Sequence, residues 1–145
     1  MDLILWRHAD AADGAPDLAR ELTPRGRAQA ARMAAWMRAH LPTGFEVLAS
    51  PAVRAQQTAQ ALAMPLSTVA ALAPGASVDA ILSAAAWPAR PAAAVLVGHQ
   101  PDLGRAAAFL LSGTATEWHI DKAALWWLAG GRRAALKAVI SADLL

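Results

Sequence analysis

Cysteine is absent from this 145-residue chain, and its absence removes several kinds of chemistry at once. Without a thiol the protein can form no disulfide, use no thiolate nucleophile and hold no cysteine-bound zinc. Other metal-binding side chains do not compensate, because the sequence has no His-x-x-x-His pair and no acidic cluster with ligand spacing. We therefore expect neither a bound metal ion nor another cofactor.

Long hydrophobic runs are missing too, although 57% of the residues are hydrophobic. No apolar segment approaches the roughly 18 residues that a membrane-spanning helix needs. The N-terminus combines an acidic Asp2 with a short apolar run, which is unlike a secretory signal. We expect a single domain over residues 1–145 that resides in the cytoplasm and has no membrane partner.

The chain also lacks a strong excess of one charge. Its 13 basic and 11 acidic residues give a net charge of +2, and Arg132-Arg133 is the only adjacent basic pair. Proteins that bind nucleic acids usually carry a basic patch or stripe, so we expect no nucleic-acid partner. A phosphate-cradling glycine loop is absent as well, because Gly130-Gly131 lies in a predicted hairpin.

Short apolar runs alternate with helical patterns along most of the chain. The patterns predict strands over residues 2–6, 46–49, 66–72 and 93–97, and helices over residues 24–41, 52–63, 79–86 and 101–111. Two further strands, 122–128 and 134–140, are joined by the hairpin signal Ala129-Gly130-Gly131-Arg132. This order is typical of a three-layer α/β/α fold with a mostly parallel sheet that includes an antiparallel C-terminal hairpin.

Histidines and arginines directly follow three of the predicted strands, in the segments Arg7-His8, Ser50-Pro51-Ala52-Val53-Arg54 and Gly98-His99-Gln100-Pro101. The carboxyl ends of parallel strands lie at one edge of a sheet, where open α/β folds bind ligands. Two arginines, Arg7 and Arg54, and two histidines, His8 and His99, should therefore meet in one pocket. Guanidinium groups match phosphate oxygens and a neutral imidazole can attack phosphorus, so this pocket suits a phosphoryl group.

These segments, read as Arg7-His8-Ala9, Ser50 through Thr58 and Gly98 through Pro101, resemble in order the three signature segments of the histidine phosphatase superfamily. The short chain and the stretch Arg20-Glu21-Leu22-Thr23-Pro24-Arg25-Gly26 are similar to its SixA-type phosphohistidine phosphatase branch. The resemblance runs from residue 2 to about residue 104. It implies a six-stranded sheet whose first and fourth strands are neighbours, which would place His8 beside His99.

The resemblance also implies roles for these residues. His8 is expected to attack phosphorus and form a phosphohistidine that water then hydrolyses, and the nearby Arg7 should keep its imidazole neutral. Arg7 and Arg54 are expected to bind the non-bridging phosphoryl oxygens, and His99 to donate to the same group in the transition state. Arg20 matches a position of the SixA-like branch and either reaches the phosphate or is a solvated arginine.

The sequence departs from many superfamily members, the phosphoglycerate mutases among them, after the third strand. Those members carry a glutamate there, whereas this chain has Ala70-Ala71-Leu72-Ala73-Pro74-Gly75-Ala76. Alkyl phosphate esters need a general acid for departure of the leaving group, but the imidazole of a phosphohistidine can carry the proton on its other nitrogen. We therefore expect a phosphohistidine on a signalling or phosphotransfer protein as the substrate, with Asp10, Asp13 and Asp17 as alternative proton sources.

Two other functions fit the same residues: a phosphatase for a small phosphorylated metabolite, and a phosphate-binding module without turnover. The module could lose either His8 or His99 and keep the arginines, so the presence of both argues against it. Because the chain has no long cap insertion, we expect a pocket that is open to a protein-borne phosphate. The remaining polar and aromatic candidates are given no catalytic role and are expected to cap, pack or lie on the surface: Trp36, His40, Ser50, Gln57, Thr58 and His119.

Overall fold

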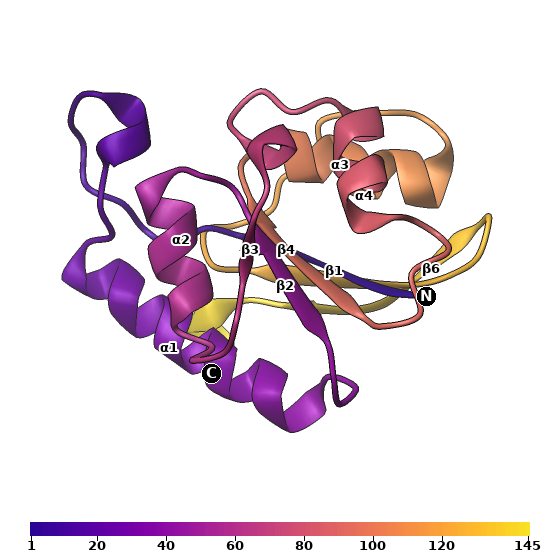
Figure 1. Cartoon of the computed structure of the whole chain (residues 1–145), viewed down its shortest axis with the longest axis horizontal. Coiled ribbons are helices and arrows are strands. Elements are labelled where there is room, and N and C mark those ends of the chain that lie inside the picture. The colour runs from indigo at the N-terminus through magenta and orange to yellow at the C-terminus, as the bar shows by residue number, and fades with distance from the viewer.

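A six-stranded sheet runs through the centre of the computed structural model, which describes residues 1–145 (Figure 1). Its order is β3-β2-β4-β1-β5-β6. The first four pair in parallel, and β5 and β6 are antiparallel to their neighbours, as predicted. The strands are β1 (Asp2–Arg7), β2 (Glu46–Ala49), β3 (Ser67–Thr68), β4 (Ala94–Gly98), β5 (Leu125–Gly130) and β6 (Ala134–Ile140).

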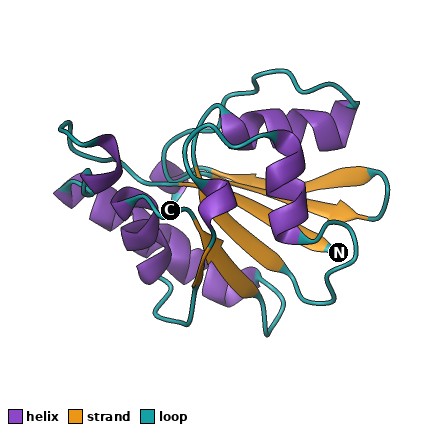
Figure 2. Ribbon diagram, turned by 45° about the horizontal axis from the view of Figure 1, so that its top comes forward, coloured by secondary structure: helices purple, strands orange, loops and turns teal.

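Helices cover both faces of the sheet and complete the predicted three layers (Figure 2). The helices are α1 (Pro24–His40), α2 (Val53–Gln60), α3 (Val78–Ala85) and α4 (Asp102–Ser112). One apolar cluster packs α1 and α2 on one face of the sheet, and a second packs α3 and α4 on the other. Alternate side chains of β1 enter the two clusters, so this strand is buried on both sides. No helix combines the length and the hydropathy needed to cross a membrane.

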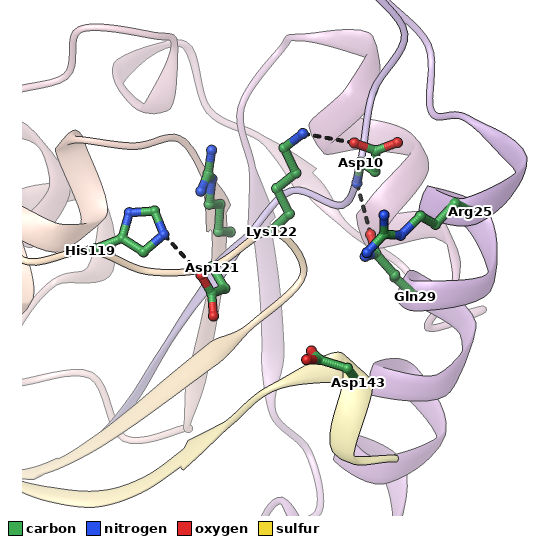
Figure 3. A pocket seen from close by; sticks show the side chains of 8 residues that line it. Asp10, Arg25, Gln29, His119, Asp121, Lys122 and Asp143 are labelled. Atoms are coloured by element: carbon green, nitrogen blue, oxygen red, sulfur yellow. Dashed lines mark hydrogen bonds and ion pairs between the residues drawn. The ribbon is translucent and has the colours of Figure 1, made fainter.

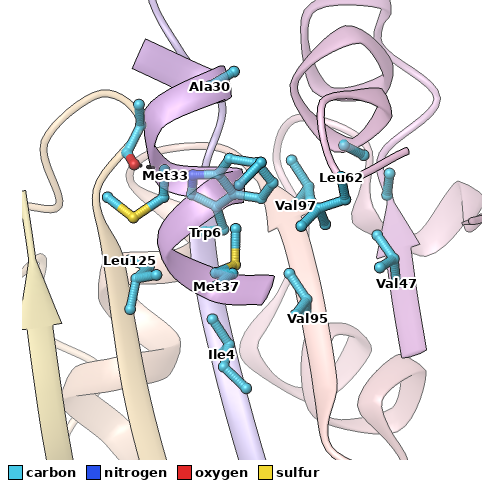
Figure 4. Close-up of a cluster of buried hydrophobic side chains, with 14 of the residues drawn as sticks. Ile4, Trp6, Ala30, Met33, Met37, Val47, Leu62, Val95, Val97 and Leu125 are labelled. Atoms are coloured by element: carbon cyan, nitrogen blue, oxygen red, sulfur yellow. Dashed lines mark hydrogen bonds between the residues drawn. The ribbon is translucent and has the colours of Figure 1, made fainter. Parts of the chain in front are cut away.

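Trp6 occupies the centre of the cluster beneath α1 (Figure 4). Its indole is fully buried, and its Nε1 donates to the carbonyl oxygen of Ala123 at 2.9 Å. Met33 and Met37 from α1 pack in the same cluster and are also fully buried. Because Trp6 immediately precedes Arg7, this packing fixes the end of β1 from which the polar residues emerge.

Three details differ from the sequence prediction. The third strand is only Ser67–Thr68, and the chain then forms a short 3₁₀ turn that buries Leu72 against α3. The helical pattern of residues 24–41 places Gln29 opposite the apolar stripe, on the polar side of the helix. In the structure Gln29 is buried and its Oε1 accepts from the Asp10 amide at 3.0 Å. Trp36 is half-buried against the core and stacks on His40, with 4.3 Å between ring centroids.

The start of α1 is fastened to the segment after β1. Thr23 caps the helix by accepting from the Gly26 amide at 3.0 Å, and its hydroxyl donates to the Asp10 carboxylate at 2.7 Å. Gly26 lies so close to Asp10 that an added Cβ would overlap the Asp10 carbonyl oxygen. A residue without a side chain is therefore required for this contact. The contact sets the path of the first loop, residues 9–22, which lies between β1 and α1.

Replacing Gly26 by alanine is expected to lower the free energy of unfolding by about 2 kcal/mol, because the added methyl group would displace the Asp10 backbone. Urea denaturation measures the change. Gly131→Ala is the matched control, since nothing lies within 4 Å of a Cβ added there, and it should stay within about 0.5 kcal/mol of the parent. Equal stabilities for the two variants would contradict the close packing.

Candidate active site

The carboxyl ends of β1, β2 and β4 bring together the polar residues that the sequence singled out. Arg7 is the last residue of β1 and pairs in register with Gly98 of β4, so His8 and His99 leave neighbouring strands at the same level. Their ring centroids lie 5.3 Å apart. Arg54, in the first turn of α2, reaches both rings: its Nε lies 3.3 Å from His8 Nε2 and its Nη2 lies 3.4 Å from His99 Nδ1.

The backbone fixes which nitrogen of His8 can react. His8 Nδ1 lies 2.8 Å from the Ala9 carbonyl oxygen, which can only accept, so Nδ1 carries the proton. The lone pair is then on Nε2, the atom that faces Arg54. This arrangement presents a nucleophilic nitrogen next to a group that binds anions.

Burial holds both imidazoles in the neutral form. It lowers the pKa of His8 to about 4, with smaller contributions in the same direction from Arg54, Arg7 and Arg20. It also lowers the pKa of His99 to about 3, helped by His8 and Arg54. The sequence analysis assigned this effect to Arg7, but loss of water around the rings is the larger cause.

Arg7 is anchored beside the two histidines. Its Nη1 donates to the Ile120 carbonyl oxygen at 2.8 Å, while its buried Nε has no hydrogen-bond partner. Its charge is close enough to lower the pKa of His8 and of His99. The four residues predicted to form one pocket, Arg7, His8, Arg54 and His99, therefore lie together.

Ser50 makes a contact that the sequence analysis did not anticipate. The residue is fully buried, and its Oγ lies 2.8 Å from His99 Nε2. The same oxygen accepts from the Ala52 amide at 3.1 Å in a turn before α2. Ser50 was expected to cap this helix, but the N-cap is Ala52 and no side chain caps it. The histidine contact depends on the pairing of β2 with β4.

Two polar residues of α2 connect the helix to the first loop instead of only packing. Thr58 Oγ1 accepts from the Ala9 amide at 3.0 Å and donates to the Arg54 carbonyl oxygen at 2.7 Å. Gln57 Oε1 accepts from the Leu22 amide at 2.7 Å. Helical spacing from Arg54 puts both on the side of α2 that meets the loop, which is the signal that sequence reasoning missed.

The first loop covers the site, in contrast to the open pocket that the sequence predicted. In Figure 1 this loop (indigo) stands out on the side of α1 and α2. Arg54 Nη1 donates to the Asp17 carbonyl oxygen at 2.8 Å, and Nη2 donates to the Asp17 carboxylate at 3.1 Å. His8, Arg54 and His99 are only 8%, 4% and 3% exposed, and none of them lines a surface cavity.

Arg20 supports the loop and makes no hydrogen bond to the two histidines. Its Nη1 donates to the Asp17 carboxylate at 3.1 Å and its Nε donates to the Ala12 carbonyl oxygen at 2.8 Å. Asp17 therefore lies between two arginines, Arg20 and Arg54, which together lower the pKa of its carboxyl group.

A polar cavity of about 480 Å³ opens beside Arg7 (Figure 3). An ion pair of Lys122 with Asp10 lines part of it, and His119 with Asp121 lines another part. No hydrophobic residue lines the cavity, so a charged or strongly polar group suits it better than an apolar one. Asp10 is already bonded to Lys122 and Thr23, which lower its pKa.

The alanine-rich segment after β3 has its own partner. The amides of Gly75 and Ala76 donate to the buried Asp102 carboxylate at 2.9 and 3.1 Å. This contact fastens the segment to the start of α4. Residues 70–76 themselves contain no carboxylate. Across the whole chain, no three His, Asp or Glu side chains gather closely enough to hold a metal ion.

Two sequence comparisons match half or more of the chain to known proteins. The family model of the histidine phosphatase superfamily (branch 1) matches residues 3–75. An uncharacterized protein of Picosynechococcus sp. is 40% identical over 143 residues, which cover 90% of this chain and 86% of that protein.

Solved structures extend the match to the whole fold. A protein histidine phosphatase SixA complexed with tungstate superposes with a TM-score of 0.86 at 25% identity, with 99% of each chain covered. A candidate SixA phosphohistidine phosphatase from Nakamurella multipartitia gives 0.78 at 30% identity, with 97% of this chain and 95% of that one covered. A candidate alpha-ribazole-5'-P phosphatase from Escherichia coli shares the fold at 19% identity, with a TM-score of 0.78 and 98% of each chain covered. By its family match, its relatives and its fold, the chain belongs to the histidine phosphatase superfamily.

Proposed function

We propose that this protein is a metal-independent phosphohistidine phosphatase that acts on a signalling or phosphotransfer protein. The observation that carries the proposal is His8, whose Nδ1 is committed to the Ala9 carbonyl oxygen while its unprotonated Nε2 faces Arg54. The lowered pKa of His8, about 4, keeps this nucleophile neutral at pH 7. The likeness to SixA structures supports the same substrate class.

The reaction proceeds by two displacements at phosphorus. His8 Nε2 attacks, the bond between phosphorus and the substrate imidazole breaks, and that imidazole leaves with a proton on its other nitrogen. The His8 ring keeps its Nδ1 proton, so the phosphorylated ring is cationic and the Ala9 carbonyl oxygen stabilises it. Water then attacks phosphorus, phosphate is released and His8 returns to its neutral form. Arg7 and Arg54 bind the phosphoryl oxygens through both steps.

His99 donates a hydrogen bond to the phosphoryl group, and Ser50 positions it. The Ser50 oxygen already accepts from the Ala52 amide, so its hydroxyl hydrogen is available for His99 Nε2. A proton donated to Nε2 favours the tautomer with hydrogen on Nδ1. In the resting site Nδ1 accepts from Arg54 Nη2, which can only donate. Once a phosphoryl group takes the Arg54 donors, Nδ1 can carry the hydrogen and donate it to a phosphoryl oxygen.

A second candidate function is hydrolysis of a small phosphorylated metabolite. The polar cavity beside Arg7 favours it, because a charged metabolite could occupy about 480 Å³ next to a bound phosphoryl group. The lack of a carboxylate among residues 70–76 argues the other way, since ester oxygens depart slowly without an acid. A phosphate-binding module without turnover is the remaining alternative.

The deciding experiment is phosphate release in EDTA from a phosphohistidine-bearing protein, with a phosphoserine peptide and a sugar phosphate assayed in parallel. We expect release from phosphohistidine at least about tenfold faster than from either ester, because its leaving group needs no acid. His8→Ala should abolish turnover, while His40→Ala, at the C-terminal end of α1, should retain it. Preference for the esters would favour the metabolite phosphatase, and no release at all would favour the binding module.

The pH dependence follows from the environment of His8. Its pKa of about 4 lies below the ordinary value of 6.5, so Nε2 remains unprotonated down to about pH 4. Since kcat/KM reports ionisation of the free enzyme, its acidic limb should fall near pH 4 after correction for the substrate's own ionisation. Circular dichroism at each pH checks that the fold persists. A limb centred near pH 6.5 would contradict the proposed environment.

Ser50→Ala should lower kcat roughly 10- to 100-fold with little change in KM, because His99 loses the partner that sets its tautomer. A double-mutant cycle separates this role from a structural one. In a His99→Ala background the same Ser50 change should cost no further activity. Additive losses in the double variant would show that Ser50 does not act through His99.

A further inference from the structure

Asp17 binds Arg54 at a nitrogen that a phosphoryl group would need. Nη1 and Nη2 of the guanidinium donate to the carbonyl oxygen and the carboxylate of Asp17, while Nε and Nη2 face His8 and His99. A phosphoryl group between the two histidines would meet Nε and Nη2. Asp17 and the phosphoryl group therefore share Nη2, and their negative charges meet there.

The tip of the loop is exposed to solvent, while its base is held by hydrogen bonds. Residues 12–19 are all exposed, and the Asp17 side chain is 57% exposed although its partner Arg54 is only 5% exposed. The base is held by backbone hydrogen bonds, from the Ala12 amide to Glu21 at 2.8 Å and from the Thr23 amide to Asp10 at 3.0 Å. Arg20 bonds Asp17 from within the loop and can remain its partner after the carboxylate leaves Arg54.

We infer that Asp17 is a specificity-determining residue that occupies Arg54 until a phosphoryl dianion displaces it. The inference rests on the proposed role of Arg54 as a phosphate ligand. A carboxylate attached to the protein acts at a high effective concentration, so a free carboxylate in solution does not displace Asp17 from Arg54. A dianion with several oxygens can also engage Arg7 and His99, which offsets the loss of the Asp17 contact. Asp17 thus sets the binding free energy that a ligand must supply to displace it from Arg54, and monoanionic ligands do not supply it.

The same contacts argue against Asp17 as the general acid. Its carboxylate accepts hydrogen bonds from Arg20 and Arg54, and both arginines favour the ionised form. An ionised carboxylate has no proton to give to a leaving group. It repels an incoming phosphoryl dianion, so its charge raises the concentration of oxyanion needed to fill the site.

Titration calorimetry with tungstate tests the inference without any need for the natural substrate. Asp17→Asn keeps the size of the side chain and removes its charge, and we expect it to bind tungstate about tenfold more tightly than the parent protein. Asp13→Asn is the matched control, because it removes one negative charge from the same exposed loop without a contact to Arg54. Its affinity should change less than about twofold. In an Arg54→Gln background the Asp17 substitution should have a much smaller effect, because only the repulsion between Asp17 and the anion remains.

Equal tungstate affinity for Asp17→Asn and Asp13→Asn, or weaker binding by Asp17→Asn, would overturn the inference and leave the proposed function intact. Binding by Asp17→Asn but not by the parent protein would support the inference in its strongest form. Failure of every variant, including the parent, to bind tungstate would overturn both the inference and the anion site on which the proposed function depends.

Discussion

The parallel pairing of β1 with β4 is the constraint on which the site depends. It places Arg7 in register with Gly98, so the residues that follow, His8 and His99, emerge side by side at one edge of the sheet. β4 is buried throughout and β1 is buried except at its two end residues, which leaves little freedom for this register to shift. Two histidines that are far apart in the chain thereby lie with their ring centroids 5.3 Å apart.

Burial then sets the chemistry of the site. Two imidazoles and one guanidinium are removed from water together, and a cationic imidazole next to Arg54 would be costly. The protein resolves this by keeping both histidines neutral and the arginine charged. The Asp17 carboxylate pairs with that charge from the solvent side. The charge of Arg54 is therefore already met by one anion, and a phosphoryl group in the proposed reaction would have to share Nη2 with Asp17.

Sequence reasoning predicted the parts of this account that depend on local patterns. Apolar runs that end in Arg7-His8, Ser50 and Gly98-His99 mark the strand ends, and the carboxyl ends of parallel strands lie at one edge of the sheet, which brings these residues together. Sequence reasoning could not predict contacts that depend on how a loop folds back. The burial of Gln29 beneath Asp10 and the bond from Arg54 to Asp17 both arise from the path of residues 10–22. The third strand was overestimated because Leu72 is buried by a turn, and an apolar residue alone does not distinguish the two.

The measurement that tests the central claim most directly is identification of the phosphorylated atom in the reacting enzyme. Rapid quenching at alkaline pH, followed by mass spectrometry and phosphorus NMR, locates the group and distinguishes the two imidazole nitrogens. Since Nδ1 of His8 donates to the Ala9 carbonyl oxygen, the account predicts a phosphohistidine on His8 linked through Nε2. A phosphoryl group on His99, an Nδ1-linked isomer on His8, or turnover with no phosphoenzyme would contradict it.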